Sequence, residues 1–324
     1  MNKIKVGICG YGNLGRGVES EIVKNPDMEL RAVFSRRDTL EIASDAAVVQ
    51  IDNALEWKDK IDVMILCGGS ANDLPVQGPQ FARDFNTVDS FDTHAKIPEY
   101  FAAVDAAAKS GGNIALISIG WDPGLFSIMR LYAQSILPAG ESFTFWGKGV
   151  SQGHSDAIRR IAGVADAVQY TIPLQDAIDK AKRGEGAGLT TRDKHIRECF
   201  VVAADGADKA RIEREIEEMP NYFADYDTKV HFISAEELAA NHSGMPHGGN
   251  VIHLGNTGKD NNQVIEYKLQ LDSNPEFTAS VLIAYARAAH RLSRQGQTGA
   301  RTAFDIPPAM LSPVDADILR KDLL

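Results

Sequence analysis

Short apolar runs recur along the first 120 residues, and each is followed by a longer stretch that mixes apolar and polar residues. Runs of four to eight apolar residues are typical of buried strands, and the stretches between them have the length of helices. Strands that alternate with helices predict an α/β fold with a doubly wound, mostly parallel sheet. The predicted strands are 4–9, 29–34, 48–51, 62–66, 85–88 and 113–119, with helices over about 13–25 and 98–110.

The pattern changes at Phe126. A predicted helix over 126–137 is followed by longer runs in which apolar and polar residues alternate. In the run from Val264 to Leu271, for example, the even-numbered positions face away from the odd-numbered ones. This period of two indicates a second, α+β part with a mixed or antiparallel sheet that is covered on one face. The predicted elements are strands 143–146, 167–172, 196–203, 228–233, 251–254 and 264–271, and helices 275–295 and 314–323.

Length and composition narrow the class of protein. At 324 residues the chain is long for one hydrophobic core, so we expect two lobes. The formal net charge of −10 argues against a nucleic-acid surface, and no apolar run reaches the length of a membrane span. The first residues do not form a signal-peptide core, and the three cysteines, Cys9, Cys67 and Cys199, lie far apart. These features predict a cytoplasmic protein with reduced thiols.

The first predicted strand runs directly into a G-x-G-x-x-G turn, Gly10-Tyr11-Gly12-Asn13-Leu14-Gly15, which opens the first predicted helix. In this order, Gly10 allows a tight turn, Gly12 lets the backbone approach a pyrophosphate, and Gly15 lets helix and strand pack closely. The helix N-terminus then offers unpaired N–H groups to the anion. We therefore expect a Rossmann-type dinucleotide site, although a glycine-rich turn without a ligand is the alternative.

The end of the second predicted strand indicates which dinucleotide is bound. An NAD-selective site places Asp or Glu there, to accept hydrogen bonds from the ribose 2′-hydroxyl. This chain has Ser35-Arg36-Arg37 instead, and a hydroxyl with two guanidiniums can hold a 2′-phosphate. The sequence therefore predicts NADP, with a solvated basic strand end as the alternative.

Two aspartates, Asp92 and Asp122, follow the carboxyl ends of predicted strands, where cofactor and substrate meet in an open α/β sheet. A pair of carboxylates suits a cationic ammonium group, which it can bind and help to deprotonate. Loop or helix-capping aspartates are the alternative. Trp121 and Trp146 either wall the pocket or belong to the core.

Several motifs together resemble one enzyme family. The glycine turn, Ser35-Arg36-Arg37, Gly120-Trp121-Asp122-Pro123-Gly124 and Ser151-Gln152-Gly153-His154-Ser155-Asp156 look like those of meso-diaminopimelate dehydrogenase. So do the stretches 168–171, 245–249 and 274–275, and the resemblance runs nearly end to end. It implies an NADP-binding domain at 1–124, a domain for substrate binding and dimerisation at 125–296, and a segment at 297–324 that packs back on the first.

The resemblance implies NADP-dependent oxidative deamination of the D-centre of meso-2,6-diaminopimelate, giving L-2-amino-6-oxopimelate, ammonia and NADPH. It implies a dimer or larger homo-oligomer in the pathway to lysine. Asp92 and Asp122 are the expected catalytic residues. The expected substrate contacts are Asp92, Trp121, Asp122, Trp146, Gln152, Gly153, Thr171, Arg197, His247 and Asn274. The expected cofactor contacts are Gly10, Tyr11, Gly12, Asn13, Leu14, Gly15, Ser35, Arg36, Arg37, Cys67, Gly68, Gly69, Ser70, Ser90, Phe91 and Asp92.

Other interpretations stay open at this point. Arg197 lies on an apolar strand and could be an ordinary surface arginine, and His247 could be a loop histidine without a role. Another two-lobed oxidoreductase, such as a dihydrodipicolinate reductase or homoserine dehydrogenase, and a non-catalytic NADP sensor are the rival functions. We predict no metal site, because His242, His247 and His253 do not have the spacing of known zinc ligands.

Overall fold

The computed structural model describes residues 3–259 and 261–324. The chain forms two compact units: unit 1 comprises Met1–Ile128 and Pro275–Leu324, and unit 2 comprises Met129–Asn274. The boundary falls inside helix α4 (Leu125–Ile136) and at the start of helix α10 (Asn274–Arg294).

Unit 1 is built on a seven-stranded sheet in the order β14-β6-β5-β4-β1-β2-β3, and every neighbouring pair in it is parallel. The predicted doubly wound parallel sheet is therefore confirmed. Its strands are β1 Ile4–Cys9, β2 Met28–Ser35, β3 Ala47–Gln50, β4 Val63–Leu66, β5 Thr87–Asp89, β6 Ile114–Leu116 and β14 Gly299–Arg301. The helices of unit 1 besides α4 and α10 are α1 Asn13–Ile22, α2 Leu74–Ala82, α3 Ile97–Gly111 and α11 Ala316–Leu323, with 3₁₀ turns η1 Ile51–Trp57, η2 His94–Lys96, η3 Ala303–Asp305 and η4 Pro308–Met310.

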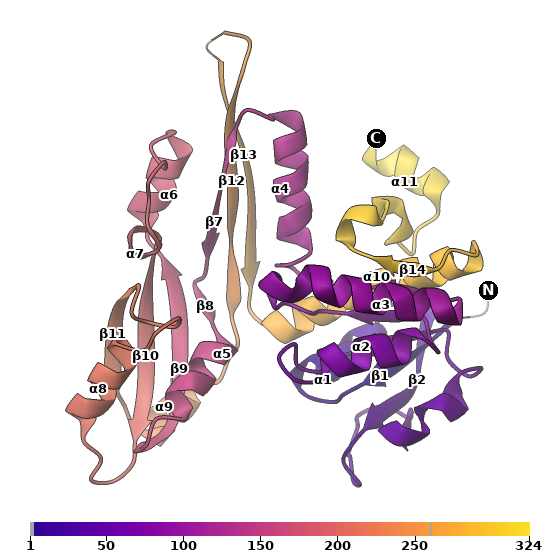
Figure 1. Ribbon diagram of the computed structural model, residues 1–324, viewed down its shortest axis with the longest axis horizontal. Coiled ribbons are helices and arrows are strands. Elements are labelled where there is room, and N and C mark those ends of the chain that lie inside the picture. Colours follow the sequence, from indigo (N-terminus) through magenta and orange to yellow (C-terminus); the bar gives the residue numbers. More distant parts are fainter. Residues whose placement is uncertain (1–2, 260) are drawn as a thin grey trace. The chain divides into compact units, whose positions relative to one another are not determined.

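Both faces of this sheet are covered by apolar side chains, which is why its strands read as nearly continuous apolar runs. In β4, Val63 and Ile65 join the core on the side of α1 and α10, whereas Met64 and Leu66 join the core on the side of α2 and α3. Figure 1 shows α2 and α3 side by side over one face of the sheet. Successive residues of one strand thus serve two separate cores, as the period of two requires.

The expected boundary of the second domain at residue 296 is wrong, because α10 belongs to unit 1. Its buried face, which includes Leu282 and Tyr285, completes the core on the α1 side of the sheet. Arg287, fully buried on the same helix, donates through Nε to Asp27 Oδ2 at 2.6 Å and through Nη1 to the carbonyl of Leu311 at 2.7 Å. The strand β14, which carries no apolar run, was also missed; it follows α10 and pairs with β6.

Unit 2 contains two sheets, one of four strands in the order β11-β10-β9-β8 and one of three strands in the order β13-β12-β7. Among the strand pairs that the structure describes in unit 2, only β10–β11 is parallel, so the predicted mixed sheet is confirmed. The strands are β7 Glu141–Trp146, β8 Gly149–Val150, β9 Val164–Pro173, β10 His195–Ala203, β11 Asp227–Phe232, β12 His247–Thr257 and β13 Asn261–Leu271. The helices are α5 Gln152–Arg159, α6 Gln175–Lys182, α7 Thr191–Lys194, α8 Lys209–Glu217 and α9 Ala235–Asn241.

Alternation along the strands of unit 2 determines what each sheet face carries. In β13 the even-numbered positions from Val264 to Gln270 are exposed, and the odd-numbered ones are half-buried or buried. In β10, His195, Arg197, Cys199 and Val201 are all buried on one face. This face of the four-stranded sheet is therefore partly polar, and it carries Arg197, one of the candidate site residues of unit 2.

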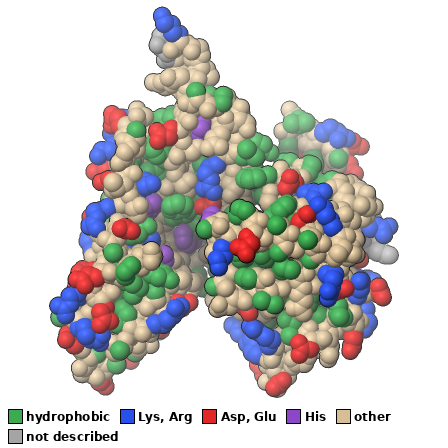
Figure 2. Space-filling model, viewed as in Figure 1, with side chains coloured by type: hydrophobic (Ala, Val, Ile, Leu, Met, Phe, Trp, Pro, Cys, Tyr) green, Lys and Arg blue, Asp and Glu red, His purple; other side chains and the backbone are tan. Residues whose placement is uncertain are grey.

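The outer surface mixes charges of both signs. On the face that Figure 2 shows, Lys and Arg side chains are interspersed with Asp and Glu, as the net charge of −10 leads one to expect. Within residues 3–259 and 261–324, no helix has the length and apolar character needed to cross a membrane.

Candidate functional site

The glycine turn of unit 1 has the geometry that a dinucleotide pyrophosphate requires. Gly10 has a φ of +92°, a backbone conformation that residues other than glycine rarely adopt. A Cβ on Gly15 would lie 2.3 Å from the carbonyl oxygen of Gly10, so only glycine lets α1 pack this close to β1. A Cβ on Gly12, in contrast, would meet no atom within 4 Å. The open space thus lies beside Gly12, where the phosphates are expected.

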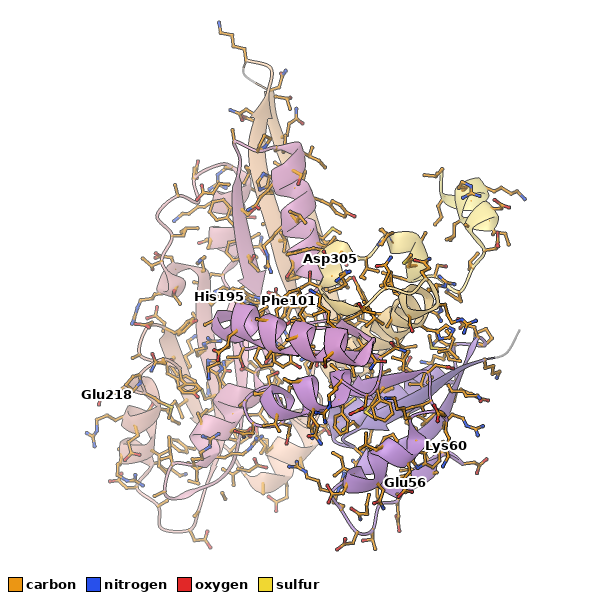
Figure 3. The ribbon with its side chains drawn as sticks, turned by 45° about the vertical axis from the view of Figure 1, so that its right-hand side comes forward. Glu56, Lys60, Phe101, His195, Glu218 and Asp305 are labelled. Atoms are coloured by element: carbon orange, nitrogen blue, oxygen red, sulfur yellow. The ribbon has the colours of Figure 1, made fainter. Side chains whose placement is uncertain are left out.

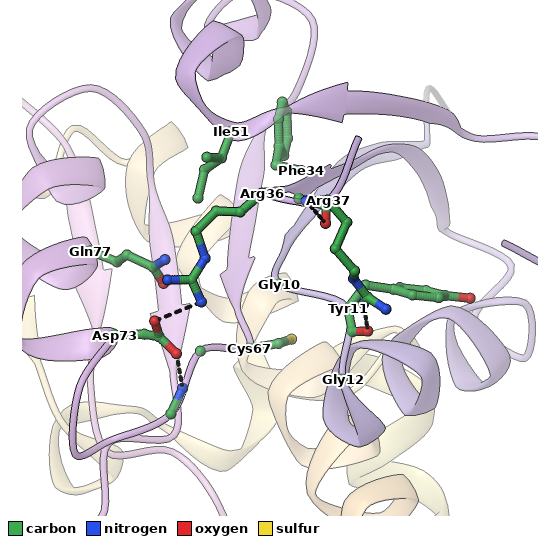
Figure 4. Close-up of a pocket in the computed structure, with 13 residues that line it drawn as sticks. Gly10, Tyr11, Gly12, Phe34, Arg36, Arg37, Ile51, Cys67, Asp73 and Gln77 are labelled. Atoms are coloured by element: carbon green, nitrogen blue, oxygen red, sulfur yellow. Dashed lines mark hydrogen bonds and ion pairs between the residues drawn. The ribbon is translucent and has the colours of Figure 1, made fainter. Parts of the chain in front are cut away.

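A cavity of about 460 Å³ opens at this turn, near the point where the strand order reverses between β1 and β4 (Figure 4). In open α/β sheets, ligands bind at such a switch point. The cavity is lined by Gly10, Tyr11, Gly12, Phe34, Ser35, Arg36, Arg37, Ile51, Cys67, Gly68, Gly69, Asp73 and Gln77. It therefore brings together the glycine turn, the basic end of β2 and the glycine loop after β4, as predicted.

The basic end of β2 is held in place by hydrogen bonds around the cavity. The backbone N–H of Arg37 donates to Ser35 Oγ at 3.0 Å, and the Arg37 guanidinium donates to the carbonyl of Tyr11. Arg36, whose side chain is 71% exposed, pairs with Asp73 through Nη2 and Oδ1 at 3.0 Å. Both guanidiniums thus lie along the cavity, and β2 ends in Ser35 rather than in the acidic residue that is typical of an NAD site.

The other predicted cofactor contacts lie around the cavity but do not line it. Asn13, Leu14 and Gly15 form the first turn of α1. Ser70 Oγ accepts a hydrogen bond from the backbone N–H of Asp92 at 3.1 Å, which links the loop after β4 to the loop after β5. Phe91 is 1% exposed and its ring stacks on Tyr100. The side chain of Phe91 therefore belongs to the core, and the structure does not place it on the cavity.

Asp92 and Asp122 follow β5 and β6, which are neighbouring parallel strands, so both residues lie at the same edge of the sheet. Asp92 is exposed and Asp122 is half-buried. Trp121 is 8% exposed and packs edge-on against Phe126, with ring centroids 5.3 Å apart. The two aspartates are thus at least partly accessible to solvent, whereas Trp121 belongs mainly to the core.

In unit 2, three side chains form a row across the four-stranded sheet. Arg197 on β10 faces Thr171 on β9 and Thr228 on β11. Its guanidinium donates to Thr171 Oγ1, and Tyr226 covers it with a ring centroid 3.9 Å from Cζ. Arg197 is 6% exposed, and burial lowers the pKa of its guanidinium, which still remains charged. A buried arginine with this environment is not an ordinary strand-surface residue.

Two polar atoms of this row of side chains have no hydrogen-bond partner among the residues that the structure describes. In the described part of the chain, Arg197 Nε and Thr228 Oγ1 are buried without a hydrogen-bond partner. Buried polar atoms in native proteins are nearly always paired, so an unpaired donor beside a charged group indicates a ligand. A carboxylate is the group that an arginine fork binds best.

The other predicted contacts of unit 2 lie on the neighbouring elements. A Cβ on Gly149, which pairs with Thr171, would lie 2.5 Å from the ring of His247, so this glycine lets His247 approach the row. The backbone N–H of Asn274 donates to the carbonyl of Met245 at 2.9 Å, two residues before His247. Gln152 and Gly153 open α5.

Trp146 is held by a residue that sequence reasoning missed. Its backbone N–H donates to Nε2 of His195 at 2.9 Å, and its ring stacks near the imidazole. His195 begins β10 (Figure 3) and is 2% exposed. Burial lowers its pKa to about 4, so the ring is neutral and can accept this hydrogen bond. Trp146 itself is 39% exposed, unlike a core tryptophan.

Comparisons with known proteins agree with these features. Residues 120–273 match the family model described as the diaminopimelic acid dehydrogenase C-terminal domain. The chain is 62% identical to the meso-diaminopimelate D-dehydrogenase of Ureibacillus thermosphaericus and covers all of both chains. It is 51% identical to the enzyme of that name from Corynebacterium glutamicum over 98% of each chain. The chain belongs to the meso-diaminopimelate dehydrogenase family.

Solved members of the family share its fold. The C. glutamicum DAP dehydrogenase in complex with DAP has a TM-score of 0.93 at 50% identity and covers both chains completely. An engineered D-amino acid dehydrogenase bound to NADP+ has a TM-score of 0.88 at 49% identity, again over the full length of both.

Four residues near the expected meso-diaminopimelate dehydrogenase site were not predicted from the sequence. Asp73 lines the cavity and accepts from the backbone N–H of Gly69 at 3.0 Å. Tyr226 and His195 support Arg197 and Trp146, and Asp89 lies behind the loop of Asp92. Only Asp73 had a signal in the sequence, because an aspartate two residues before Pro75 is typical of a helix start. The others became visible only through tertiary contacts.

No group of three or more His, Cys, Asp or Glu side chains in residues 3–259 and 261–324 is arranged to hold a metal ion. The histidines that could suggest zinc have other partners. His253 lies against Ser142 Oγ and the carbonyl of Leu137, and His242 Nδ1 lies 3.0 Å from the Tyr170 hydroxyl.

Proposed function

We propose that this chain is an NADP-dependent amino-acid dehydrogenase that acts on meso-2,6-diaminopimelate. It oxidises the D-centre, and meso-2,6-diaminopimelate, water and NADP+ give L-2-amino-6-oxopimelate, ammonium, NADPH and a proton. The oxo acid cyclises to tetrahydrodipicolinate. The reaction is reversible, and in the direction of ammonia fixation it serves the synthesis of diaminopimelate and lysine.

The observation that carries this proposal is the 62% identity to a meso-diaminopimelate D-dehydrogenase over the full length of both chains. Features within each unit support the same reaction. The aspartates of unit 1 suit an ammonium group, and the arginine row of unit 2 suits a carboxylate. Meso-2,6-diaminopimelate carries both kinds of group.

NADP fits the residues of the unit 1 cavity. The open space beside Gly12, the N-terminus of α1 and the paired arginines match the pyrophosphate and the 2′-phosphate of the cofactor. We propose that Gly10 to Gly15 hold the pyrophosphate and that Ser35, Arg36 and Arg37 hold the 2′-phosphate. The loops Cys67 to Ser70 and Ser90 to Asp92 complete the site.

In this proposal Asp92 and Asp122 bind the ammonium group of the substrate and take part in proton transfer. Their carboxylates bind the ammonium of the D-centre and help to remove its proton, which makes loss of hydride from Cα favourable. Bound NADP+ supplies the hydride acceptor. The substrate is left as an imine, water adds to it, and ammonia leaves. One of the two carboxylates takes a proton from that water. Trp121 is the neighbouring contact for the same end of the substrate.

The residues of unit 2 discriminate among substrates in this proposal. Arg197 and Thr171 bind the distal carboxylate, with His247 and Asn274 as further donors. Trp146, Gln152 and Gly153 contact the remaining atoms of the substrate. Because an unmatched buried arginine is costly, a substrate without the distal carboxylate is a poorer ligand.

Deuterium labelling tests the chemistry directly. Meso-2,6-diaminopimelate deuterated at the D-centre Cα should react more slowly and pass its label to the reduced cofactor. The matched control is the same compound deuterated at the L-centre, which should react at the normal rate and give unlabelled NADPH. Label transfer from the L-centre, or from neither, would contradict the proposal.

We infer further that unit 1 is the cofactor domain, that unit 2 contributes the subunit interface, and that the enzyme is a cytoplasmic homodimer or larger homo-oligomer. The free cysteines Cys9, Cys67 and Cys199 suit a reducing compartment. Light scattering on the purified protein tests the assembly, and a mass of one chain, 35.2 kDa, would contradict it.

A further inference from the structure

Asp89 is a buried carboxylate that the proposed reaction does not use. It is the last residue of β5 and is 1% exposed. Burial raises its pKa to about 6, because desolvation disfavours the charged form. Such a group is retained where its acceptor oxygens are needed. Its contacts show where that need lies.

One oxygen of Asp89 joins two loops. Oδ1 accepts from the backbone N–H of Phe91 at 2.9 Å, which is in the loop that carries Asp92. The same Oδ1 accepts from the backbone N–H of Ser118 at 3.1 Å, which leads into the loop that carries Asp122. The backbone of Asp89 adds a third bond, because its carbonyl accepts from the N–H of Ile119 at 2.8 Å. Asp89 is thus bonded to both loops within a few residues of each aspartate.

The other oxygen is held by helix α3. Tyr100 donates its hydroxyl to Asp89 Oδ2 at 2.7 Å, and its ring stacks on Phe91 with centroids 4.1 Å apart. A Cβ on Gly78 of α2 would lie 2.0 Å from the Tyr100 hydroxyl, so this glycine leaves the space in which the hydroxyl reaches Asp89. Two helices and two loops are therefore adjusted to a single carboxylate.

The bond to Ser118 also accounts for an unusual backbone conformation. Ser118 has a φ of +57°, which residues other than glycine adopt only where the surroundings hold them. The Asp89 carboxylate accepts a hydrogen bond from the backbone N–H of Ser118, a residue that is buried. The turn at Ser118 sets the direction in which the chain enters Gly120-Trp121-Asp122.

We propose that Asp89 is a positioning residue that fixes the loops 90–93 and 118–124 relative to each other, and through them Asp92 and Asp122. This inference rests on the proposed function for its catalytic consequence, but the coupling of the two loops is independent of any substrate. Asp89 acts by accepting hydrogen bonds, and it does not touch the substrate.

The test compares two substitutions of nearly the same shape, Asp89→Asn and Asp89→Leu. Asparagine keeps an oxygen for the N–H groups of Phe91 and Ser118, and its amide can donate to the Tyr100 hydroxyl. Leucine removes every acceptor but fills the same volume. Thr87→Val, at a buried position of the same strand, is the control for a general disturbance of β5.

Amide hydrogen exchange of the loops is measured first, with NADPH bound and without substrate. We expect Asp89→Leu to speed exchange in both loops by roughly tenfold, as the loss of a buried hydrogen bond implies, whereas Asp89→Asn and Thr87→Val match the parent. If Asp89→Leu does not fold, Asp89→Ala takes its place. Unchanged exchange, or faster exchange in one loop only, would overturn the coupling of the loops even if the protein lacks the proposed activity.

The second arm measures kcat and KM with meso-2,6-diaminopimelate. Asp89→Leu should lower kcat on the order of 10- to 100-fold with little change in KM for NADP, as expected when catalytic groups are displaced by a fraction of an ångström. Asp89→Asn should recover most of this loss. A full kcat in Asp89→Leu, or an equal loss in Asp89→Asn, would overturn the positioning role. Lack of turnover in the parent protein would instead contradict the proposed function. The hydrogen-exchange result alone would then decide whether Asp89 couples the two loops.

Discussion

The ring of Tyr226 covers the guanidinium of Arg197, with Cζ of the arginine 3.9 Å from the ring centroid. The two residues are on β10 and just before β11, and the contact closes one side of a buried cation whose Nη1 is bonded to Thr171. A cation–π contact of a desolvated arginine contributes on the order of 2 kcal/mol and orients the guanidinium plane. Tyr226 thus restricts the orientation of the guanidinium, which we propose binds the distal carboxylate of the substrate.

Arg197→Met is expected to impair turnover of meso-2,6-diaminopimelate much more than turnover of a simple D-amino acid, because only the former has a distal carboxylate. Tyr226→Leu should have the same selectivity with a smaller effect, roughly tenfold in kcat/KM. Tyr226→Phe, which keeps the ring, is the matched control. Steady-state kinetics on both substrates measure this. Equal losses on the two substrates would show that Arg197 does not bind the distal carboxylate.

Replacing Arg36 and Arg37 together by alanine is expected to raise the KM for NADP by roughly 10- to 100-fold, since each charge-assisted hydrogen bond to a phosphate is worth about 1.5–3 kcal/mol. The KM for NAD, which lacks the 2′-phosphate, should change little. The ratio of kcat/KM for the two cofactors is the measurement. An unchanged preference for NADP would show that another group reads the 2′-phosphate.

Gly12 and Gly15, which are three residues apart in the same turn, should respond differently to substitution by alanine. At Gly12 a Cβ has free space, so Gly12→Ala is expected to change the free energy of unfolding by only about 0.5 kcal/mol while weakening NADP binding. At Gly15 a Cβ would meet the Gly10 carbonyl at 2.3 Å, so Gly15→Ala should cost about 1–3 kcal/mol of stability. Thermal unfolding with and without NADP separates the two effects. A marked loss of stability in Gly12→Ala would contradict the assignment of that space to the cofactor.

The buried imidazole of His195 predicts a pH dependence of stability. Burial lowers its pKa to about 4, whereas an unfolded histidine titrates near 6.5. Between these values the unfolded chain binds a proton that the folded chain does not, so stability falls as the pH is lowered from about 6.5 to 4. The full loss is on the order of 3 kcal/mol.

His195→Gln removes this titration and keeps an acceptor for the N–H of Trp146. The variant should therefore lose less stability than the parent between pH 7.5 and pH 5, whatever its stability at pH 7.5. His154, whose pKa burial also lowers to about 4, stays in both proteins and does not affect the comparison. Identical slopes of unfolding free energy against pH would rule out a buried neutral His195.

The sequence allowed most of the sheet of unit 1 to be predicted because strands such as β1 and β4 are buried on both faces and are nearly pure apolar runs. The turn at Gly10 and the basic residues after β2 could also be predicted, because their chemistry depends on residues that are neighbours in the sequence. The strand β14 was not, since Gly299-Ala300-Arg301 becomes a strand only through its pairing with β6. The assignment of α10 failed for a similar reason: an amphipathic helix does not reveal which core it completes.

The candidate site divides in the same way. Asp92 and Asp122 were proposed from their places after predicted strands, and Arg197 was proposed from the family resemblance. Asp89 and Tyr226 were not predicted. Asp89 looks like any strand-end aspartate, and Tyr226 lies 29 positions from Arg197 in the sequence. Their roles arise from long-range contacts, which periodicity and local motifs do not encode.

The most direct test of the proposed activity is the formation of NADPH with meso-, LL- and DD-2,6-diaminopimelate in parallel, repeated with NAD for the best substrate. We predict rapid NADPH formation with the meso isomer, little with the LL isomer, which has no D-centre, and a clear preference for NADP over NAD. Binding of NADPH without turnover of any isomer would contradict the proposed reaction while leaving the cofactor site intact.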